Sequence, residues 1–146
     1  MKLLPPHLVL IGVALIAVSG LVLPGPELLQ GVWRLTGVLP GALGVGLLAA
    51  GSGLFRRLGT NIRTFDEPGV LVVDGPFRFS RNPMYLGFSL VLLGLALGTG
   101  HATPLAIPAA FFAVANLWYV PFEERAMHAK FGPDYEQYRR TTRRWI

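Results

Sequence analysis

The chain contains no cysteine among its 146 residues, and few of its residues are charged. The missing cysteines exclude disulfides, thiolate nucleophiles and cysteine-ligated metal sites. Asp, Glu, Lys and Arg make up 14% of the residues, whereas a soluble domain is nearer one quarter charged. Only three histidines are present, too scattered to predict a metal site: His7, His101 and His128. These shortages leave a chain dominated by apolar residues.

The apolar residues are gathered in four stretches without any Asp, Glu, Lys or Arg, namely residues 8–26, 35–55, 82–100 and 102–122. Each is close to the roughly 20 residues with which an α-helix crosses about 30 Å of hydrocarbon. The stretches are continuously apolar rather than alternating, which argues against membrane strands. The sequence therefore predicts an all-α integral membrane protein with four transmembrane helices. We interpret the N-terminal stretch as the first span rather than as a cleaved signal peptide.

One domain covering residues 1–146 accounts for this length. It divides into two N-terminal spans (1–55), a connection (56–82), a helical hairpin (83–122) and a C-terminal segment (123–146). The hairpin is predicted because only Gly100, His101 and Ala102 separate the last two apolar stretches. After it, Gly132-Pro133 should end the long helix, and a short cytosolic helix should follow.

The net charge of +5 is distributed unevenly along the chain. Twelve of the thirteen basic residues fall at the N-terminus, between spans two and three, or in the C-terminal tail, and Arg34 alone lies elsewhere. Four crossings would place these three regions on one side, so the positive-inside rule puts both termini in the cytosol. The short chain, rich in glycine and alanine, suggests a bacterial-type inner membrane. This placement favours membrane lipids, rather than nucleic acid, as partners.

The second apolar stretch is rich in small residues, and Gly37 and Gly41 form a G-x-x-x-G pair. Such pairs let helices approach closely in lipid. They predict close packing of this span, and association of two copies through the same face is also open.

Two polar clusters flank the predicted hairpin. The first runs from Gly75 to Gly87, and the second contains Glu123-Glu124 and then the segment from Phe131 to Tyr138. An antiparallel hairpin brings the start of one helix within about 8–10 Å of the end of the other. We therefore expect the two clusters to form one site at the cytosolic edge.

The same residues resemble a known signature. Isoprenylcysteine carboxyl methyltransferases and related membrane phospholipid methyltransferases share G-P-Y-R-x-x-R-H-P-x-Y-x-G, followed one hairpin later by E-E and F-G-x-x-Y-x-x-Y. This chain is similar over roughly residues 64–144. Phe77 replaces the usual Tyr, and Asn82 replaces the His of eukaryotic members. Because an amide cannot titrate, an acid–base role at that position is in doubt.

The resemblance implies an S-adenosylmethionine-dependent methyltransferase whose lipophilic substrate, an isoprenylcysteine-like carboxylate or a phospholipid, arrives from the bilayer. It implies catalytic roles for Arg81, Glu123 and Glu124. The cofactor-binding residues that it implies are Arg78, Asn82, Pro83, Tyr85, Leu86, Gly87, Glu124, Tyr135 and Tyr138. The glutamates suit the sulfonium, ribose or amino group, Arg81 a carboxylate, and the tyrosines the adenine or a cation. Each of these residues could also have a purely structural role, as a charge that sets the membrane topology, a solvated ion pair or an aromatic residue that packs a helix.

Two other functions are compatible with the sequence. Membrane sterol reductases have a similar terminal module and use NADPH, but they are usually much longer. A four-span transporter or assembly protein fits the length, although transporters usually place an ionisable residue within a span. The four charge-free stretches contain no Asp, Glu, Lys or Arg, so the methyltransferase interpretation is favoured.

Overall fold

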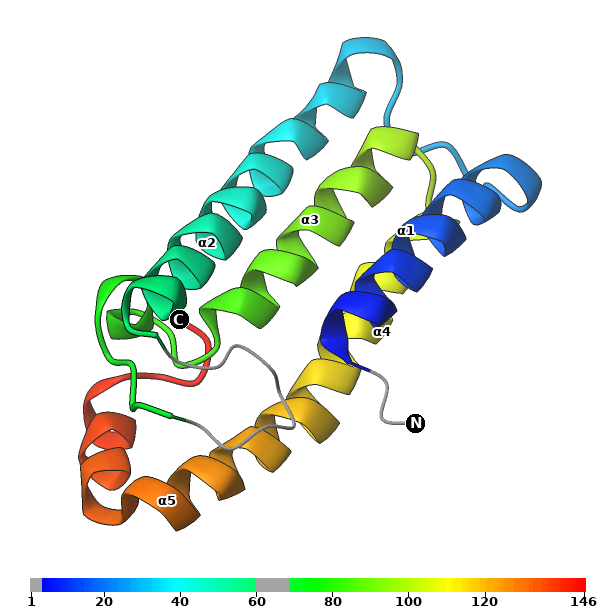
Figure 1. Cartoon of the computed structure of the whole chain (residues 1–146). Coiled ribbons are helices and arrows are strands. Elements are labelled where there is room, and N and C mark those ends of the chain that lie inside the picture. The colour runs from blue at the N-terminus through cyan, green and yellow to red at the C-terminus, as the bar shows by residue number, and fades with distance from the viewer. Residues whose placement is uncertain (1–3, 60–68) are drawn as a thin grey trace.

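The computed structural model describes residues 4–59 and 69–146, which form helices and one isolated β-bridge (Figure 1). The described residues contain five α-helices: α1 (Pro5–Val22), α2 (Val38–Arg57), α3 (Pro83–Thr99), α4 (Ala106–Val114) and α5 (Val120–Thr141). Three further segments are 3₁₀ turns: η1 (Gly31–Gly37), η2 (Gly75–Arg78) and η3 (Thr103–Leu105). A π-helical segment, η4 (Ala115–Tyr119), joins α4 to α5. The expected all-helical fold is therefore confirmed.

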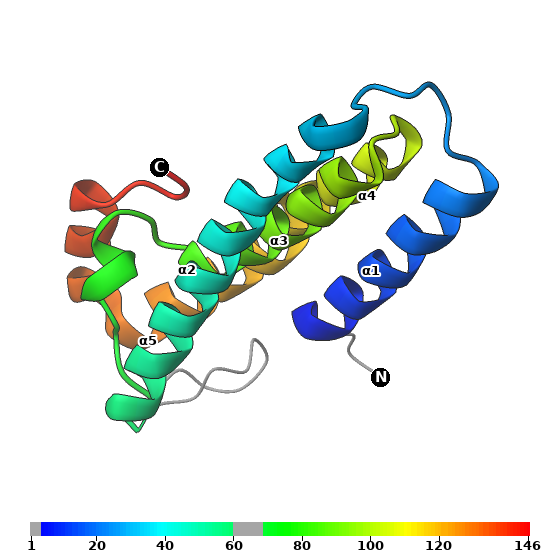
Figure 2. The same ribbon diagram turned by 90° about the horizontal axis from the view of Figure 1, so that it is seen from above.

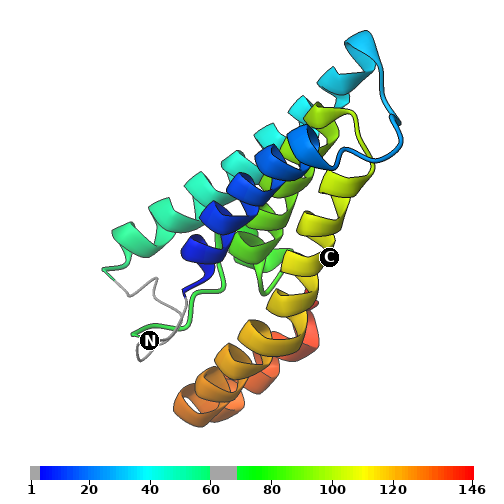
Figure 3. The ribbon, with the colours of Figure 1, turned by 90° about the vertical axis from the view of Figure 1, so that its right-hand side faces the viewer.

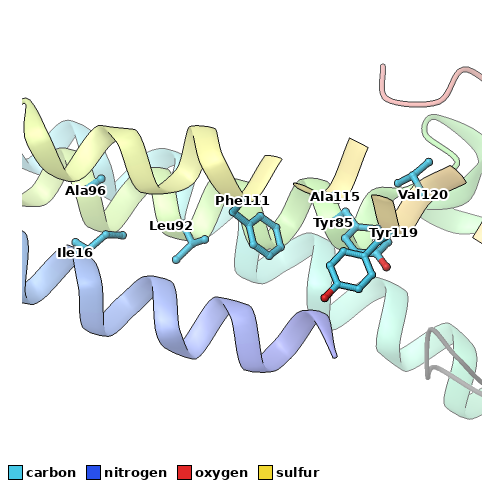
Figure 4. Packing of buried hydrophobic residues seen from close by; sticks show 8 residues of the cluster. All are labelled: Ile16, Tyr85, Leu92, Ala96, Phe111, Ala115, Tyr119 and Val120. Atoms are coloured by element: carbon cyan, nitrogen blue, oxygen red, sulfur yellow. The ribbon is translucent and has the colours of Figure 1, made fainter. Parts of the chain in front are cut away.

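The helix α3 lies at the centre and contacts α1, α2 and α4 (Figures 1 and 2). Pro83 stands in its first turn, where the missing N–H costs no hydrogen bond. Gly100 ends it with a left-handed φ of 78°, and α4 then returns as its antiparallel neighbour. Side chains from α1, α3, α4, η4 and the start of α5 share one apolar core (Figure 4), composed of Ile16, Tyr85, Leu92, Ala96, Phe111, Ala115, Tyr119 and Val120. The predicted hairpin is present.

Glycines bring α2 and α3 together backbone to backbone. A Cβ atom added at Gly44 would lie 2.5 Å from the Gly87 carbonyl oxygen, and one at Gly94 would lie 2.5 Å from the Gly37 carbonyl oxygen. Both pairs of glycines are seven residues apart, so they meet in register on two antiparallel helices. The predicted close packing of this stretch is thus made within the chain. Association of copies through α2 stays a prediction.

Within the part of the chain that the structure describes, three helical stretches are long and apolar enough to span a membrane: Pro5–Val22, Gly31–Arg57 and Thr103–Thr141. The helix α3 is also apolar but has only 17 residues. Large apolar side chains are exposed on the outer faces of these helices, including Leu21 at 85% and Leu117 at 76% exposure. A helix that is apolar all round belongs in a large core or in a membrane. These helices accordingly describe a membrane protein.

The connections at the end of the bundle distant from η2 are joined to each other. The backbone N–H groups of Leu28 and Leu29 both donate to the Gly100 carbonyl, at 2.8 and 3.0 Å. Ala102 N–H donates to the Pro26 carbonyl at 3.0 Å. The segment between α1 and η1 is therefore hydrogen-bonded to the turn between α3 and α4, and we name this contact the backbone clasp.

The helix α5 is interrupted at Gly132, whose φ of 46° and ψ of −117° are not helical. Pro133 follows and begins a second helical piece that ends at Thr141. This confirms the predicted break and the short final helix. Beyond the break the chain turns back toward the start of α3 (Figures 1 and 3).

Candidate functional site

The short turn η2 anchors the final helix beside the start of α3. Phe77 is buried and packs edge-on against the ring of Phe55 from α2, with the ring centres 5.4 Å apart. The Tyr138 hydroxyl donates to the Phe77 carbonyl oxygen at 2.7 Å. Residues 61 positions apart are therefore fixed to each other.

Arg81 and Glu124 form the central ion pair of this region. Arg81 Nη2 lies 2.9 Å from Glu124 Oε1, and the two side chains are 10% and 15% exposed. Arg81 Nη1 also donates to the carbonyl oxygens of Arg139 and Thr142, both at 3.2 Å. Its Nε is buried and has no hydrogen-bond partner among the described residues. The guanidinium thus connects α3 to α5 and keeps one donor uncommitted there.

A second guanidinium holds the same carboxylate. Arg144 donates from Nε to Glu124 Oε1 at 3.1 Å and from Nη2 to Oε2 at 2.5 Å. Such two-pronged pairing fixes the orientation of both partners. Glu124 therefore lies between two cations, and the local charge of the trio is positive.

Asn82 binds the backbone that carries Arg144. Its Nδ2 donates to the Arg144 carbonyl oxygen at 2.9 Å, and Ser80 Oγ donates to the same oxygen at 3.3 Å. The Arg81 N–H adds a bond to the Arg143 carbonyl at 3.0 Å. Residues 142–146, which we name the C-terminal strap, are thus tied across the start of α3.

Glu123 points to a different partner from that of Glu124. The Tyr85 hydroxyl donates to Glu123 Oε1 at 2.8 Å. The Tyr85 ring stacks on Tyr119 with the ring centres 6.0 Å apart, so this hydroxyl is held at the polar end of the apolar core (Figure 4). The two adjacent glutamates therefore serve two different parts of the site.

These groups line a partly open pocket with a cavity volume of about 50 Å³. Its polar wall carries Arg81, Asn82, Glu123 and Glu124, which come from both predicted clusters. The remaining wall is apolar or aromatic and comprises Phe55, Leu71, Val72, Phe77, Met127, Tyr135 and Tyr138. The two clusters therefore lie together, as the hairpin predicted, and their role as a functional site stays a prediction.

Both tyrosines in the pocket keep their protons at physiological pH. Burial and, secondarily, the charge of Glu124 together raise the pKa of Tyr135 to about 12, against the opposing charges of nearby arginines. Burial likewise raises the pKa of Tyr138, against the opposing effect of Arg81. They are therefore neutral aromatic walls and hydroxyl donors rather than bases.

The structure brings together most, but not all, of the residues expected at the site. Arg81, Asn82, Glu123, Glu124, Tyr135 and Tyr138 line the pocket, and Tyr85 reaches it through Glu123. The others do not line it: Arg78 is exposed, Pro83 is buried in the first turn of α3, Leu86 is half-buried, and Gly87 faces α2. The structure gives the positions of all these residues, and their roles in catalysis or cofactor binding stay predictions.

Sequence reasoning missed Arg144 as a partner of Glu124, because it counted only as one of many basic tail residues. It also missed Asn116, whose Oδ1 accepts a hydrogen bond from Trp145 Nε1 at 3.0 Å. One signal was available: Asn116 is the single amide side chain in the stretch 102–122. Within residues 4–59 and 69–146, no cluster of His, Asp or Glu is suited to a metal ion.

Apolar helices around a partly charged pocket define the class as a multi-pass membrane protein with a polar site at one end. Comparison with known families gives the narrower assignment. Residues 33–134 match the phospholipid methyltransferase family, and this match covers more than half of the chain. The chain belongs to the phospholipid methyltransferase family, which is a family of membrane methyltransferases.

One relative is an uncharacterised protein of Haemophilus influenzae, 33% identical over 63 residues. The alignment covers 43% of this chain and all of the relative. No solved structure matches the chain.

Proposed function

We propose that the protein is an S-adenosylmethionine-dependent methyltransferase that methylates a lipophilic acceptor from the bilayer. The observation that carries this proposal is the pocket itself. It gathers two carboxylates, an arginine, an amide and two neutral tyrosines at one end of an apolar bundle. Several of these groups also join the final helix to the start of α3, and together they are suited to a zwitterionic nucleoside.

The donors in the pocket fit the chemical groups of S-adenosylmethionine. The uncommitted Nε of Arg81 and the surplus positive charge around Glu124 suit the α-carboxylate. Glu123 suits a cation or a ribose hydroxyl, and Tyr135 and Phe77 offer aromatic surface to the base. When bound, the cofactor supplies an electrophilic methyl group on a sulfonium.

The cavity volume is small beside the roughly 300–1,000 Å³ of ordinary ligand sites. Occupancy by a nucleoside therefore requires one wall to move outward. Leu71 and Val72 stand in non-helical backbone, so their displacement breaks no helix. The polar wall, in contrast, is fixed by ion pairs on both sides of Glu124.

Methyl transfer is an in-line displacement, so orientation supplies much of the acceleration. The residues of this chain hold the reacting groups and exclude water. Tyr85 holds Glu123 at the boundary between the pocket and the apolar core, where a lipophilic acceptor would meet the cofactor. A carboxylate acceptor is already ionised at pH 7, whereas an amine must lose a proton first. The isoprenylcysteine-like carboxylate and the phospholipid remain the two acceptor classes to compare.

The proposal places four spans in the membrane, with α3 as the shortest, and both termini in the cytosol. The basic residues of α5 and the strap then lie beside anionic headgroups. A bacterial-type inner membrane is the corresponding location.

The test is isothermal titration of the purified protein with S-adenosylmethionine and S-adenosylhomocysteine. Saturable binding that is lost in Glu124→Gln and kept in Glu136→Gln supports the proposal, since Glu136 lies in an exposed ion pair. A folded protein that binds NADPH, but neither S-adenosylmethionine nor S-adenosylhomocysteine, would overturn the proposal in favour of a reductase. Radiolabelled methyl transfer to an isoprenoid carboxylate or to a phospholipid then separates the two acceptor classes.

A further inference from the structure

The C-terminal strap has an anchor outside the pocket. Trp145 Nε1 donates to Asn116 Oδ1 at 3.0 Å, and the Trp145 ring lies 4.6 Å from that of Phe112, centre to centre. Trp145 also packs against the apolar core. The strap thus reaches from the end of α5 across the start of α3 to α4 and η4.

Asn116 lies in the π-helical segment η4, between the apolar helix α4 and the polar helix α5. An amide in such surroundings is costly to leave unpaired. Its oxygen accepts the indole N–H of Trp145, so the strap satisfies a polar atom of the bundle. The π-helical turn is a local irregularity of the kind often found at functional sites.

Arg144 directly precedes this anchor. Its side chain holds both oxygens of Glu124, and its carbonyl accepts from Asn82 and Ser80. When Trp145 is docked, the guanidinium has little freedom to leave the carboxylate. When Trp145 is released, the strap keeps its backbone bonds and the Arg144–Glu124 pair, but the residue next to Arg144 is no longer held.

We propose that Trp145 and Asn116 form an anchor that positions Arg144 on Glu124 and thereby sets the geometry of the pocket. Both are positioning residues, because neither lines the pocket. Only the ligand-binding consequence rests on the proposed function; the anchor and its coupling to Glu124 do not. The expected consequence is that loss of the anchor weakens binding of the cofactor without unfolding the helices.

The first test uses thiol labelling, because the chain has no cysteine of its own. Thr142→Cys places one thiol at a buried strap position, 7% exposed. In this background Trp145→Phe and Asn116→Leu should each raise the labelling rate roughly fivefold to tenfold, as expected for loss of one hydrogen bond. Trp118→Phe removes the same N–H from a side chain that is 70% exposed and should leave the rate unchanged. A thiol that is labelled equally fast in the parent and in both anchor variants overturns the anchor.

The second test is a double-mutant cycle on thermal unfolding, which needs no ligand. Trp145→Phe and Glu124→Gln should couple, so that the Tm loss of the double variant falls about 2–4 °C short of the sum. Trp118→Phe combined with Glu124→Gln should be additive. Additive losses for Trp145→Phe as well would show that the anchor does not position Arg144.

S-adenosylhomocysteine titration completes the experiment. Trp145→Phe should weaken binding about fivefold to tenfold, and Trp118→Phe should not change it. Unchanged binding in Trp145→Phe would overturn the effect on the pocket. If the parent protein binds neither S-adenosylmethionine nor S-adenosylhomocysteine, the proposed function fails. The labelling rates and the double-mutant cycle then still test the anchor.

Discussion

The helix α3 is held by two different kinds of contact, and opposite kinds of substitution should disrupt them. Toward α2 it presents glycines, and backbone meets backbone at Gly44–Gly87 and Gly37–Gly94. Toward α5 and the strap it presents Arg81 and Asn82, which bind a carboxylate and backbone carbonyls. The first contact has no room for an added atom, and the second has no substitute for a lost partner.

This difference follows from the surroundings of each contact. Lipid provides no hydrophobic force between helices, so α2 and α3 depend on van der Waals contact at short distance. At the polar end, charges removed from water need partners of opposite sign. Additions should therefore disrupt the glycine contact, and deletions should disrupt the polar one.

The largest effect is expected for Glu124→Gln, which leaves two guanidinium groups without their carboxylate. Breaking a buried pair costs about 3–5 kcal/mol, and the lower end applies because Arg144 is 38% exposed. Methyl transfer should fall about 100-fold, since the polar wall loses its geometry. Thermal unfolding and labelled-methyl assays measure the two effects.

Glu136→Gln is the matched control for that variant. Glu136 also pairs with an arginine, Arg139, at 2.9 Å, but both side chains are well exposed. Exposed pairs contribute about 0–1 kcal/mol, so neither stability nor activity should change appreciably. Equal losses in the two variants would contradict the distinction between them.

An intermediate effect is expected for Gly44→Ala. The added Cβ would lie 2.8 Å from the Val91 nitrogen as well as against Gly87, so α2 and α3 must separate. Overpacking of this kind costs about 1–3 kcal/mol. Gly46→Ala on the same helix meets nothing within 4 Å and should raise the Tm slightly, because Ala is favoured over Gly in a helix by about 0.5–1 kcal/mol. A Gly44→Ala variant as stable as Gly46→Ala would refute the close approach.

The smallest effect is expected for Tyr138→Phe, which removes one hydroxyl and leaves the ring. The Phe77 carbonyl then loses its 2.7 Å donor in a buried place. A net cost of about 0.5–1.5 kcal/mol should appear as a modest fall in Tm. A variant as stable as the parent would indicate that water replaces the hydroxyl.

Much of the fold was predictable because it depends on composition. The absence of charge from long stretches predicted the helices, and the three-residue turn at Gly100–Ala102 predicted that α3 and α4 would be antiparallel. That geometry alone brought Arg81 and Glu124 together. Gly132-Pro133 predicted the break in α5 for an equally local reason, since Pro removes an N–H and Gly permits the positive φ.

What was missed depends on contacts that leave little trace in the sequence. The strap is held largely through the carbonyls of Arg143 and Arg144, which any residue would provide. The glycine contact was expected from the four-residue spacing of Gly37 and Gly41. The structure confirms this pair, because a Cβ at Gly94 would lie 2.5 Å from the Gly37 carbonyl oxygen and 2.7 Å from the Gly41 nitrogen. It adds a second contact, Gly44 with Gly87, one seven-residue step further along both helices.

The backbone clasp between the two connections distant from the pocket bears on the order of assembly. Leu28 and Leu29 donate to Gly100, which follows them in the sequence by 72 and 71 residues. During synthesis the clasp therefore cannot form before α3 has been made, although α1 and α2 precede it in the chain. Its hydrogen bonds join the first two helices to the second half of the bundle only once that half is present.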